Sequence, residues 1–207
     1  MKLDAIRTRL AAHAPDRAEI LGRDRASVAL VLRDGAVSAE LLLIERARRE
    51  GDPWSGHMAL PGGRLAPEER SSRVAAARET FEEVGLDLTD AEYLGRLDDC
   101  AGNPRVSPRL LVSAHAFHLP GDPPLRLDPR EVQTAFWFPL ADLHDESRHV
   151  EHVIPQLPDV RFPGIVVGRP DRHVVWGLTL RILDHLLQVV DDPFRRTWGD
   201  TSRFRGV

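Results

Sequence analysis

The sequence predicts an α+β fold in which helices pack on a mixed β-sheet. Two β-rich runs lie at 26–46, a short acidic helix follows around 78–84, and further strands precede a strongly apolar helix at 174–190. This order of strands and helices is typical of layers built around one sheet. With 207 residues, 42% of them hydrophobic, the chain is long enough to bury a sizeable core.

The first elements follow from local patterns. Residues 3–13 have the apolar spacing of a short amphipathic helix, which Pro15 ends. The segment 26–46 predicts a hairpin, because the pair Asp34-Gly35 at its centre favours the positive backbone angles of a tight turn.

The remaining elements are punctuated by turn residues. Residues 49–70 are rich in glycine and proline and predict a loop that leads into the acidic helix. A short turn of helix is expected at 140–144 after Pro139, and the spacing of leucines predicts the helix at 174–190. Further strands are expected at 92–99, 109–118 and 132–138.

Domain organisation follows from these elements. We expect an N-terminal helix and linker at 1–22, one folded domain at 23–192, and a basic C-terminal tail at 193–207 that is poorly ordered. The apolar stripe of the last helix is typical of core, and the seam of a homodimer is the alternative.

Composition excludes several function classes. A formal net charge of -4 gives no basic field for a nucleic-acid polymer, although a small anion neutralised by metal remains compatible. Cys100 is the only cysteine, which rules out an intramolecular disulfide and favours a reducing compartment. No apolar run is long enough to span a membrane, and the N-terminus has no secretory pattern, so we expect a cytoplasmic protein.

The stretch "RETFEEVGL", residues 78–86, carries three glutamates in five positions. At about 100° per residue, Glu82 and Glu83 fall within about 60° of Glu79. Gly85 follows where a left-handed residue usually closes a helix. We therefore expect a carboxylate face opposite a core face, the latter made of Val74, Ala77, Phe81 and Val84.

An acidic helix face is more often solvated surface than a site. The preceding "LPGGRLAPEE" changes this balance, because a glycine turn lets bare backbone approach a ligand and offer a carbonyl. Carboxylates, a carbonyl and water are the oxygen ligands that Mg²⁺ takes. A bound cation would offset the repulsion between the glutamates, so the cluster indicates a metal site.

These residues resemble the signature of the Nudix hydrolases. Five residues separate Gly63 from Glu69, as in that family, and the acidic stretch then supplies the rest of the signature in register: Arg78, Glu79, Glu82, Glu83, Gly85 and Leu86. Two positions depart from it. Thr80 replaces an aliphatic residue, and eight residues rather than seven separate Glu69 from Arg78.

The longer spacing is also found in one branch, the coenzyme A pyrophosphatases. This chain is similar to that branch in a strand that ends at Arg46, in Gly56 ahead of "LPGG", and in "VWGLT" at 175–179. The resemblance covers roughly 26–190 and implies a Nudix-like α/β/α sandwich with a central mixed sheet.

The resemblance also implies roles at matching positions. Glu79, Glu82 and Glu83 would bind metal together with the Gly62 carbonyl, and Arg78 would serve catalysis by orienting their carboxylates. The stretch "REVQTAFWFPL" places Glu131 as a further ligand or the general base. An exposed loop glutamate is the alternative reading of Glu131, and Asp128 competes for its role.

The implied activity is hydrolysis of a diphosphate linkage, with Mg²⁺ or Mn²⁺ and with Glu79 or Glu131 as base. Arg46, Trp54 and Gly63 are the substrate-binding candidates, although a solvated charge and a packed loop anchor are alternatives for the first two. Coenzyme A or a derivative is the first substrate expected. The alternatives are a dinucleotide, nucleotide sugar, ADP-ribose or oxidised nucleoside triphosphate, or a module that binds a nucleotide without cleaving it.

Overall fold

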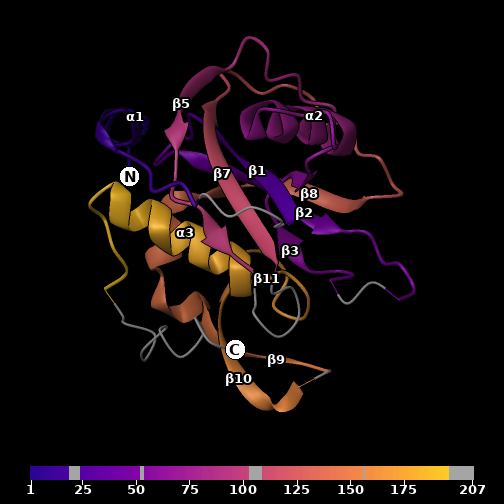
Figure 1. Cartoon of the computed structure of the whole chain (residues 1–207). Coiled ribbons are helices and arrows are strands. Elements are labelled where there is room, and N and C mark those ends of the chain that lie inside the picture. The colour runs from indigo at the N-terminus through magenta and orange to yellow at the C-terminus, as the bar shows by residue number, and fades with distance from the viewer. Residues whose placement is uncertain (19–23, 52–53, 103–108, 156, 196–207) are drawn as a thin grey trace.

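The computed structural model describes residues 1–18, 24–51, 54–102, 109–155 and 157–195. Within them the chain forms a large mixed sheet between helical layers (Figure 1). The α-helices are α1 (Leu3–Ala12), α2 (Ser72–Val84) and α3 (Gly177–Val189). The α+β sandwich expected from the sequence is confirmed.

The large sheet contains one parallel pairing, between β1 and β7, and is otherwise antiparallel in the described residues. Its path runs β3-β2-β1-β7-β5, with β4 on β1, β6 on β7 and β8 on β2. Its strands are β1 (Asp24–Arg33), β2 (Glu40–Arg46), β3 (Met58–Ala59), β4 (Gly62–Arg64), β5 (Glu92–Arg96), β6 (Cys100–Ala101), β7 (Leu110–His118) and β8 (Val132–Pro139).

A second, antiparallel sheet follows in the C-terminal part of the chain. It consists of β9 (His149–Ile154), β10 (Leu157–Val166) and β11 (Val174–Trp176), preceded by two 3₁₀ turns at Leu140–His144 and Glu146–Arg148. Figure 1 shows β9 and β10 as a separate ribbon below the main sheet. The sequence did not predict this sheet, and Val174–Trp176, expected as helix, pairs with β10 before α3 begins.

Strand alternation explains the layers. Along β1, Leu30 and Leu32 pack with α1 and α3 on one face, whereas Ala29 and Val31 pack with α2 on the other. Successive side chains of a strand point to opposite faces, so one central strand contributes to both cores. The apolar stripe of α3, including Leu183, is core, as the sequence indicated.

The hairpin between β1 and β2 is confirmed, but its turn is longer than expected. The connection runs from Asp34 to Ala39, and neither Asp34 nor Gly35 has the positive φ of a tight turn. Glycine is needed for another reason, since a Cβ at Gly35 would lie 2.4 Å from the Ser38 carbonyl oxygen. Close approach of the chain to itself, not backbone angle, explains this residue.

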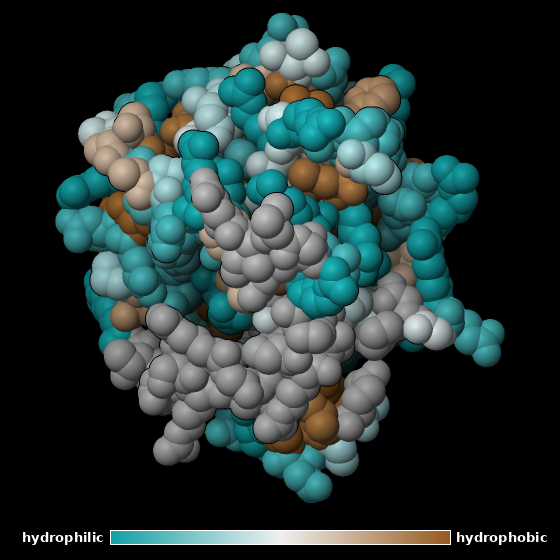
Figure 2. Space-filling model, viewed as in Figure 1, coloured by the Kyte–Doolittle hydropathy of each residue, from teal (hydrophilic) through white to brown (hydrophobic). Residues whose placement is uncertain are grey.

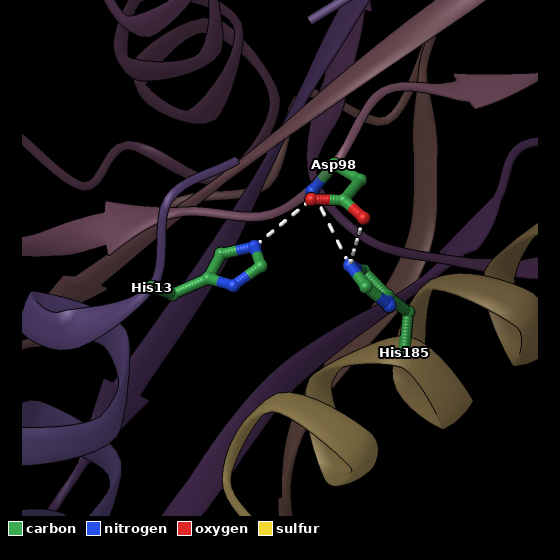
Figure 3. A group of neighbouring side chains, drawn as sticks. All are labelled: His13, Asp98 and His185. Carbon is green, nitrogen blue, oxygen red and sulfur yellow. Dashed lines mark hydrogen bonds and ion pairs between the residues drawn. The ribbon is translucent and has the colours of Figure 1, made fainter. Parts of the chain in front are cut away.

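Helix α1 is joined to the sheet and to α3 by a polar cluster (Figure 3). His13, at the end of α1, places Nε2 2.9 Å from Oδ1 of Asp98, and His185 of α3 places Nε2 3.3 Å from Oδ2. Asp98 also accepts the backbone N–H of Asp16 at 2.9 Å. One carboxylate therefore ties both helices of this layer to the turn after β5.

The surface of the molecule is mostly hydrophilic on the face shown in Figure 2. Figure 2 shows hydrophilic residues over most of the coloured surface of this face, with small and separate apolar patches. Among the described residues, every helix is too short or too polar to cross a membrane. Most of the expected tail at 193–207, and residues 19–22 of the expected linker, lie outside the described residues.

Candidate metal centre

Helix α2 begins and ends at local signals. The Ser71 hydroxyl accepts the N–H of Val74 at 3.4 Å, which satisfies one of the free donors of the first turn. At the other end Gly85 adopts φ 72° and donates its N–H to the Phe81 carbonyl. The left-handed glycine that the sequence predicted is present, two residues after the acidic cluster.

The helix is rotated relative to the prediction. Val74 and Phe81, expected in the core, are 55% and 58% exposed, whereas Glu83 is 3% exposed. Projected on the helix, the buried residues are centred near the direction of Glu83, and they are Ser72, Ala75, Ala76, Thr80, Glu83 and Val84. The predicted core face was right at Val84 and wrong at Val74 and Phe81, because a projection fixes which residues share a face, not which face meets the sheet.

The glycine turn approaches the carboxylates closely, as its composition indicated. Gly62 donates its N–H to Oε2 of Glu83 at 2.9 Å, and a Cβ at Gly63 would lie 2.4 Å from Oε2 of Glu79. A Cβ at Gly62 would meet the Ser27 carbonyl at 2.3 Å. The turn therefore needs glycine at both positions, for backbone packing at Gly62 and for room beside Glu79 at Gly63.

Burial and mutual repulsion perturb two of the glutamates. Burial raises the pKa of Glu83 to about 8, opposed by the Gly62 N–H and by Arg46 and reinforced by the charges of Glu79 and Glu131. Burial also raises the pKa of Glu79, against the ion pair with Arg78. Clustered carboxylates that resist ionisation together are a donor set that a divalent cation stabilises, so these residues fit Mg²⁺ or Mn²⁺.

Arg78 holds the cluster in place. Its guanidinium lies 2.9 Å from Oε1 of Glu79, 2.8 Å from Oε2 of Glu82 and 2.9 Å from Oε1 of Glu69. The Arg78 hydrogen bond also lowers the pKa of Glu69. Glu69 further accepts the Ala66 N–H at 2.7 Å, and its contact with Arg78 is made despite the extra residue between the two.

Glu131 and Arg46 lie near the same cluster although they are distant in sequence. The charge of Glu131 raises the pKa values of Glu79 and Glu83, whereas Arg46 lowers that of Glu83. The Glu131 backbone accepts the Ala47 N–H at 2.8 Å, which fixes the loop beside the end of β2. The structure thus brings these four charged groups within electrostatic range of one another.

Asp128, the competitor of Glu131, is engaged elsewhere. Its carboxylate lies 2.6 Å from Nη2 of Arg130, and that contact with Arg130 holds the Asp128 pKa down at about 2. Its backbone carbonyl accepts the N–H groups of Glu131 and Val132. Asp128 shapes the loop, and this favours Glu131 for the role at the cluster.

Trp54 lies at the edge of the loop that precedes the glycine turn. It is 38% exposed and makes an edge contact with His57, whose ring in turn lies 5.0 Å from that of Trp176. A line of rings therefore leads from the surface to the start of α3. Both uses of Trp54, as an anchor and as a stacking surface, are consistent with this position.

Sequence reasoning missed a buried ionic group on the opposite face of β2. Glu45 is fully buried, and its Oε1 accepts from Nε of Arg172 at 3.1 Å, while its Oε2 lies 3.4 Å from Nε2 of His173. The only signal was a glutamate inside an apolar strand. Nothing local predicts partners 127 residues away.

Comparisons with known proteins identify the family of this chain. The family model of the NUDIX domain matches residues 23–159. A protein of Schizosaccharomyces pombe is 49% identical over 107 residues, which are 50% of this chain and only 32% of that protein, about a third of its length. The Nudix hydrolase NudL of Photorhabdus laumondii is 30% identical over 150 residues, 72% of this chain and 76% of that protein.

A solved structure supports the fold. The MutT/nudix family protein from Enterococcus faecalis matches with a TM-score of 0.54 at 21% identity, over 92% of this chain and 70% of that one. The family model covers well over half of the chain. This chain therefore belongs to the NUDIX domain family.

Proposed function

We propose that the protein is a divalent-metal-dependent pyrophosphohydrolase that cleaves the diphosphate linkage of a nucleotide. The observation that carries the proposal is the gathering of Glu79, Glu83 and the charge of Glu131 beside one glycine turn, in a chain of this family. Glu82 joins them through Arg78. Coenzyme A or a derivative is the first substrate proposed. Its support is the sequence resemblance around Arg46 and at 175–179.

The chemistry follows from charge. A bound Mg²⁺ or Mn²⁺ supplies neutralisation of the diphosphate and makes water more acidic. The glutamates of α2 hold the cation with the Gly62 carbonyl, and Arg78 keeps their carboxylates in position by charge-assisted hydrogen bonds. Glu131 or Glu79 accepts the proton of the water that attacks phosphorus, and the second phosphate leaves.

Two further residues are proposed to bind the substrate. The charge of Arg46 reaches the buried Glu83, which puts this guanidinium within electrostatic range of a phosphate at the cluster. Trp54 is exposed enough to stack on a base. Gly63 leaves room beside Glu79 for the diphosphate to approach.

The test is a hydrolysis screen of purified protein with Mg²⁺ and with Mn²⁺. The substrates are coenzyme A, ADP-ribose, NADH, dinucleoside polyphosphates and nucleoside triphosphates. We expect coenzyme A to be split into an adenosine bisphosphate and a phosphopantetheine. Cleavage of another compound would assign that compound as the substrate in place of coenzyme A. Binding of nucleotides without any cleavage would show that the protein is a nucleotide-binding module and not an enzyme.

Replacing Gly63 by alanine should reduce activity without unfolding the protein. The new Cβ would meet only the end of the flexible Glu79 side chain, which can move aside and so leave its position. We expect at least about tenfold lower turnover and weaker Mn²⁺ binding, the size typical of a displaced catalytic group. The measurements are steady-state kinetics, Mn²⁺ titration and thermal unfolding.

Gly62→Ala is the matched comparison. Its Cβ would meet backbone, 2.3 Å from the Ser27 carbonyl and 2.6 Å from Cα of Val28, at φ +152°. Strain of this kind costs on the order of 1–3 kcal/mol. Unfolding at a lower temperature is therefore expected for Gly62→Ala and not for Gly63→Ala. Unchanged kinetics in Gly63→Ala would contradict the assigned position of Glu79.

A further inference from the structure

A cavity of about 830 Å³ lies beside the N-terminus of α2. We call it the arginine cavity, because five arginines and one carboxylate line it: Arg17, Arg25, Arg70, Arg73, Arg96 and Asp99. The volume is in the range of ligand sites. The lining has a local excess of four positive charges although the protein has a net charge of -4. This local positive potential attracts anions.

The single carboxylate of the cavity is already saturated. Asp99 is 2% exposed and accepts the Ser113 hydroxyl at 2.7 Å, the Ala18 N–H at 3.1 Å and the Arg96 guanidinium. In the part of the chain that the structure describes, no ion pair joins Arg17, Arg25, Arg70 or Arg73 to a carboxylate. Carboxylates of the described residues therefore do not neutralise the positive charge of these four arginines.

Arg96 provides the buried part of the site. Its side chain is 10% exposed, and Nη2 donates to Asp99 and to the Ser113 hydroxyl, at 3.0 Å in the latter case. Its Nε is buried and has no hydrogen-bond partner among the described residues. Held in this way, Arg96 presents a fixed positive charge to the wall of the cavity.

The surrounding groups suit an anion. His115 is buried between the Tyr93 hydroxyl at 3.0 Å and the Ser72 hydroxyl at 2.9 Å. Burial, then the charges of Arg96 and Arg73, lower the pKa of His115 to about 4, so those charges converge on the cavity. The start of the 13-residue helix α2 adds the positive end of its dipole.

The arginine cavity is separate from the carboxylate cluster. Ser72 precedes Glu79 by seven residues, which is about 10 Å along the helix axis. The cavity faces β7 and β5 through Ser72 and Arg73, whereas the carboxylates face β4 through Gly62 and Gly63. One ligand group at each place would lie about two turns apart along α2.

We propose that the arginine cavity binds a phosphate-bearing anion, held by Arg70, Arg73 and Arg96. Arginine matches phosphate because its fixed fork of N–H donors forms paired charge-assisted hydrogen bonds. The anion is either a phosphomonoester on a nucleotide whose diphosphate is at the carboxylate cluster, which rests on the proposed function, or a separate phosphorylated ligand.

The test is a calorimetric titration of inorganic pyrophosphate into the full chain in EDTA at low ionic strength. Without metal, the glutamates repel the anion, so binding reports the arginine cavity. We expect the double variant Arg70→Gln/Arg73→Gln to bind at least tenfold more weakly than wild type. Both arginines are exposed, and thermal unfolding checks that the variant is folded.

Two controls make the result specific. Arg161→Gln/Arg169→Gln removes the same charge from exposed positions outside the cavity and should keep the wild-type affinity within about twofold. Glu82→Gln should also keep it. Equal weakening in both arginine double variants, no measurable binding by wild type, or a gain of affinity in Glu82→Gln that survives loss of Arg70 and Arg73 would overturn the proposal.

A second titration identifies the source of the phosphate. Coenzyme A and dephospho-coenzyme A differ by one phosphomonoester, and without metal neither is hydrolysed. A preference for coenzyme A that disappears in Arg70→Gln/Arg73→Gln assigns the cavity to the nucleotide's own phosphate. Equal affinity for the two compounds, with pyrophosphate binding still dependent on Arg70 and Arg73, assigns it to a separate ligand.

Discussion

A Glu83→Gln variant is expected to remain folded and to lose at least about 10²-fold in turnover, the magnitude typical of a lost catalytic group. Glutamine has the same shape and can still accept the Gly62 N–H at the position of Oε2. Because burial already favours the neutral form of Glu83, a neutral amide adds no cost to folding. What is lost is a negative oxygen for the cation.

The same loss of turnover is expected for Glu82→Gln. Glu82 is largely exposed, so burial of its carboxylate plays no part in this expectation. The measurements are kcat with saturating Mg²⁺ and thermal unfolding of the metal-free protein. Glu68→Gln is the matched control, an exposed glutamate of the preceding loop, and should stay within about twofold of wild type. Turnover like that of wild type in both Glu82→Gln and Glu83→Gln would refute the metal assignment.

An Arg172→Ala variant is expected to lower the free energy of unfolding by about 3 kcal/mol, the cost of leaving a buried charge without its partner. Glu45 is 1% exposed, and both Nε and Nη2 of Arg172 donate to its Oε1. After the substitution His173, 3.4 Å from Oε2, is the one cationic partner left to this carboxylate among the described residues. Chemical denaturation of the metal-free protein at neutral pH measures the change.

Two further variants separate charge from packing. Arg169→Ala removes an arginine three positions away whose ion pair with Asp171 is exposed, and should change the free energy of unfolding by less than about 0.5 kcal/mol. Adding Glu45→Gln to Arg172→Ala removes the unpaired charge and should restore part of the stability. If Arg172→Ala unfolds at the same denaturant concentration as wild type, the buried pair does not stabilise the fold.

Much of the fold could be predicted from the sequence because it depends on local patterns of residues. Apolar spacing predicts α1, α3 and the strands β1, β2, β7 and β8, and Gly85 predicts the end of α2. The strands β3, β4, β9 and β10 were missed because two are very short and the others carry too many polar residues to show a clear period. Their structure depends on pairing with strands far away in sequence.

The sequence by itself determined the chemistry of the centre. The spacing of Glu79, Glu82 and Glu83 and the glycines at 62 and 63 are covalent facts, and helix geometry places the three carboxylates on one side of α2. The tertiary structure alone decided that Glu83 and most of Glu79 face the protein while Glu82 stays exposed. It also brought Glu131 and Arg46 to the cluster, paired Glu45 with Arg172, and gathered arginines from four separate segments around one cavity. The physical reason is that burial and electrostatic fields depend on distances in space, which local sequence does not encode.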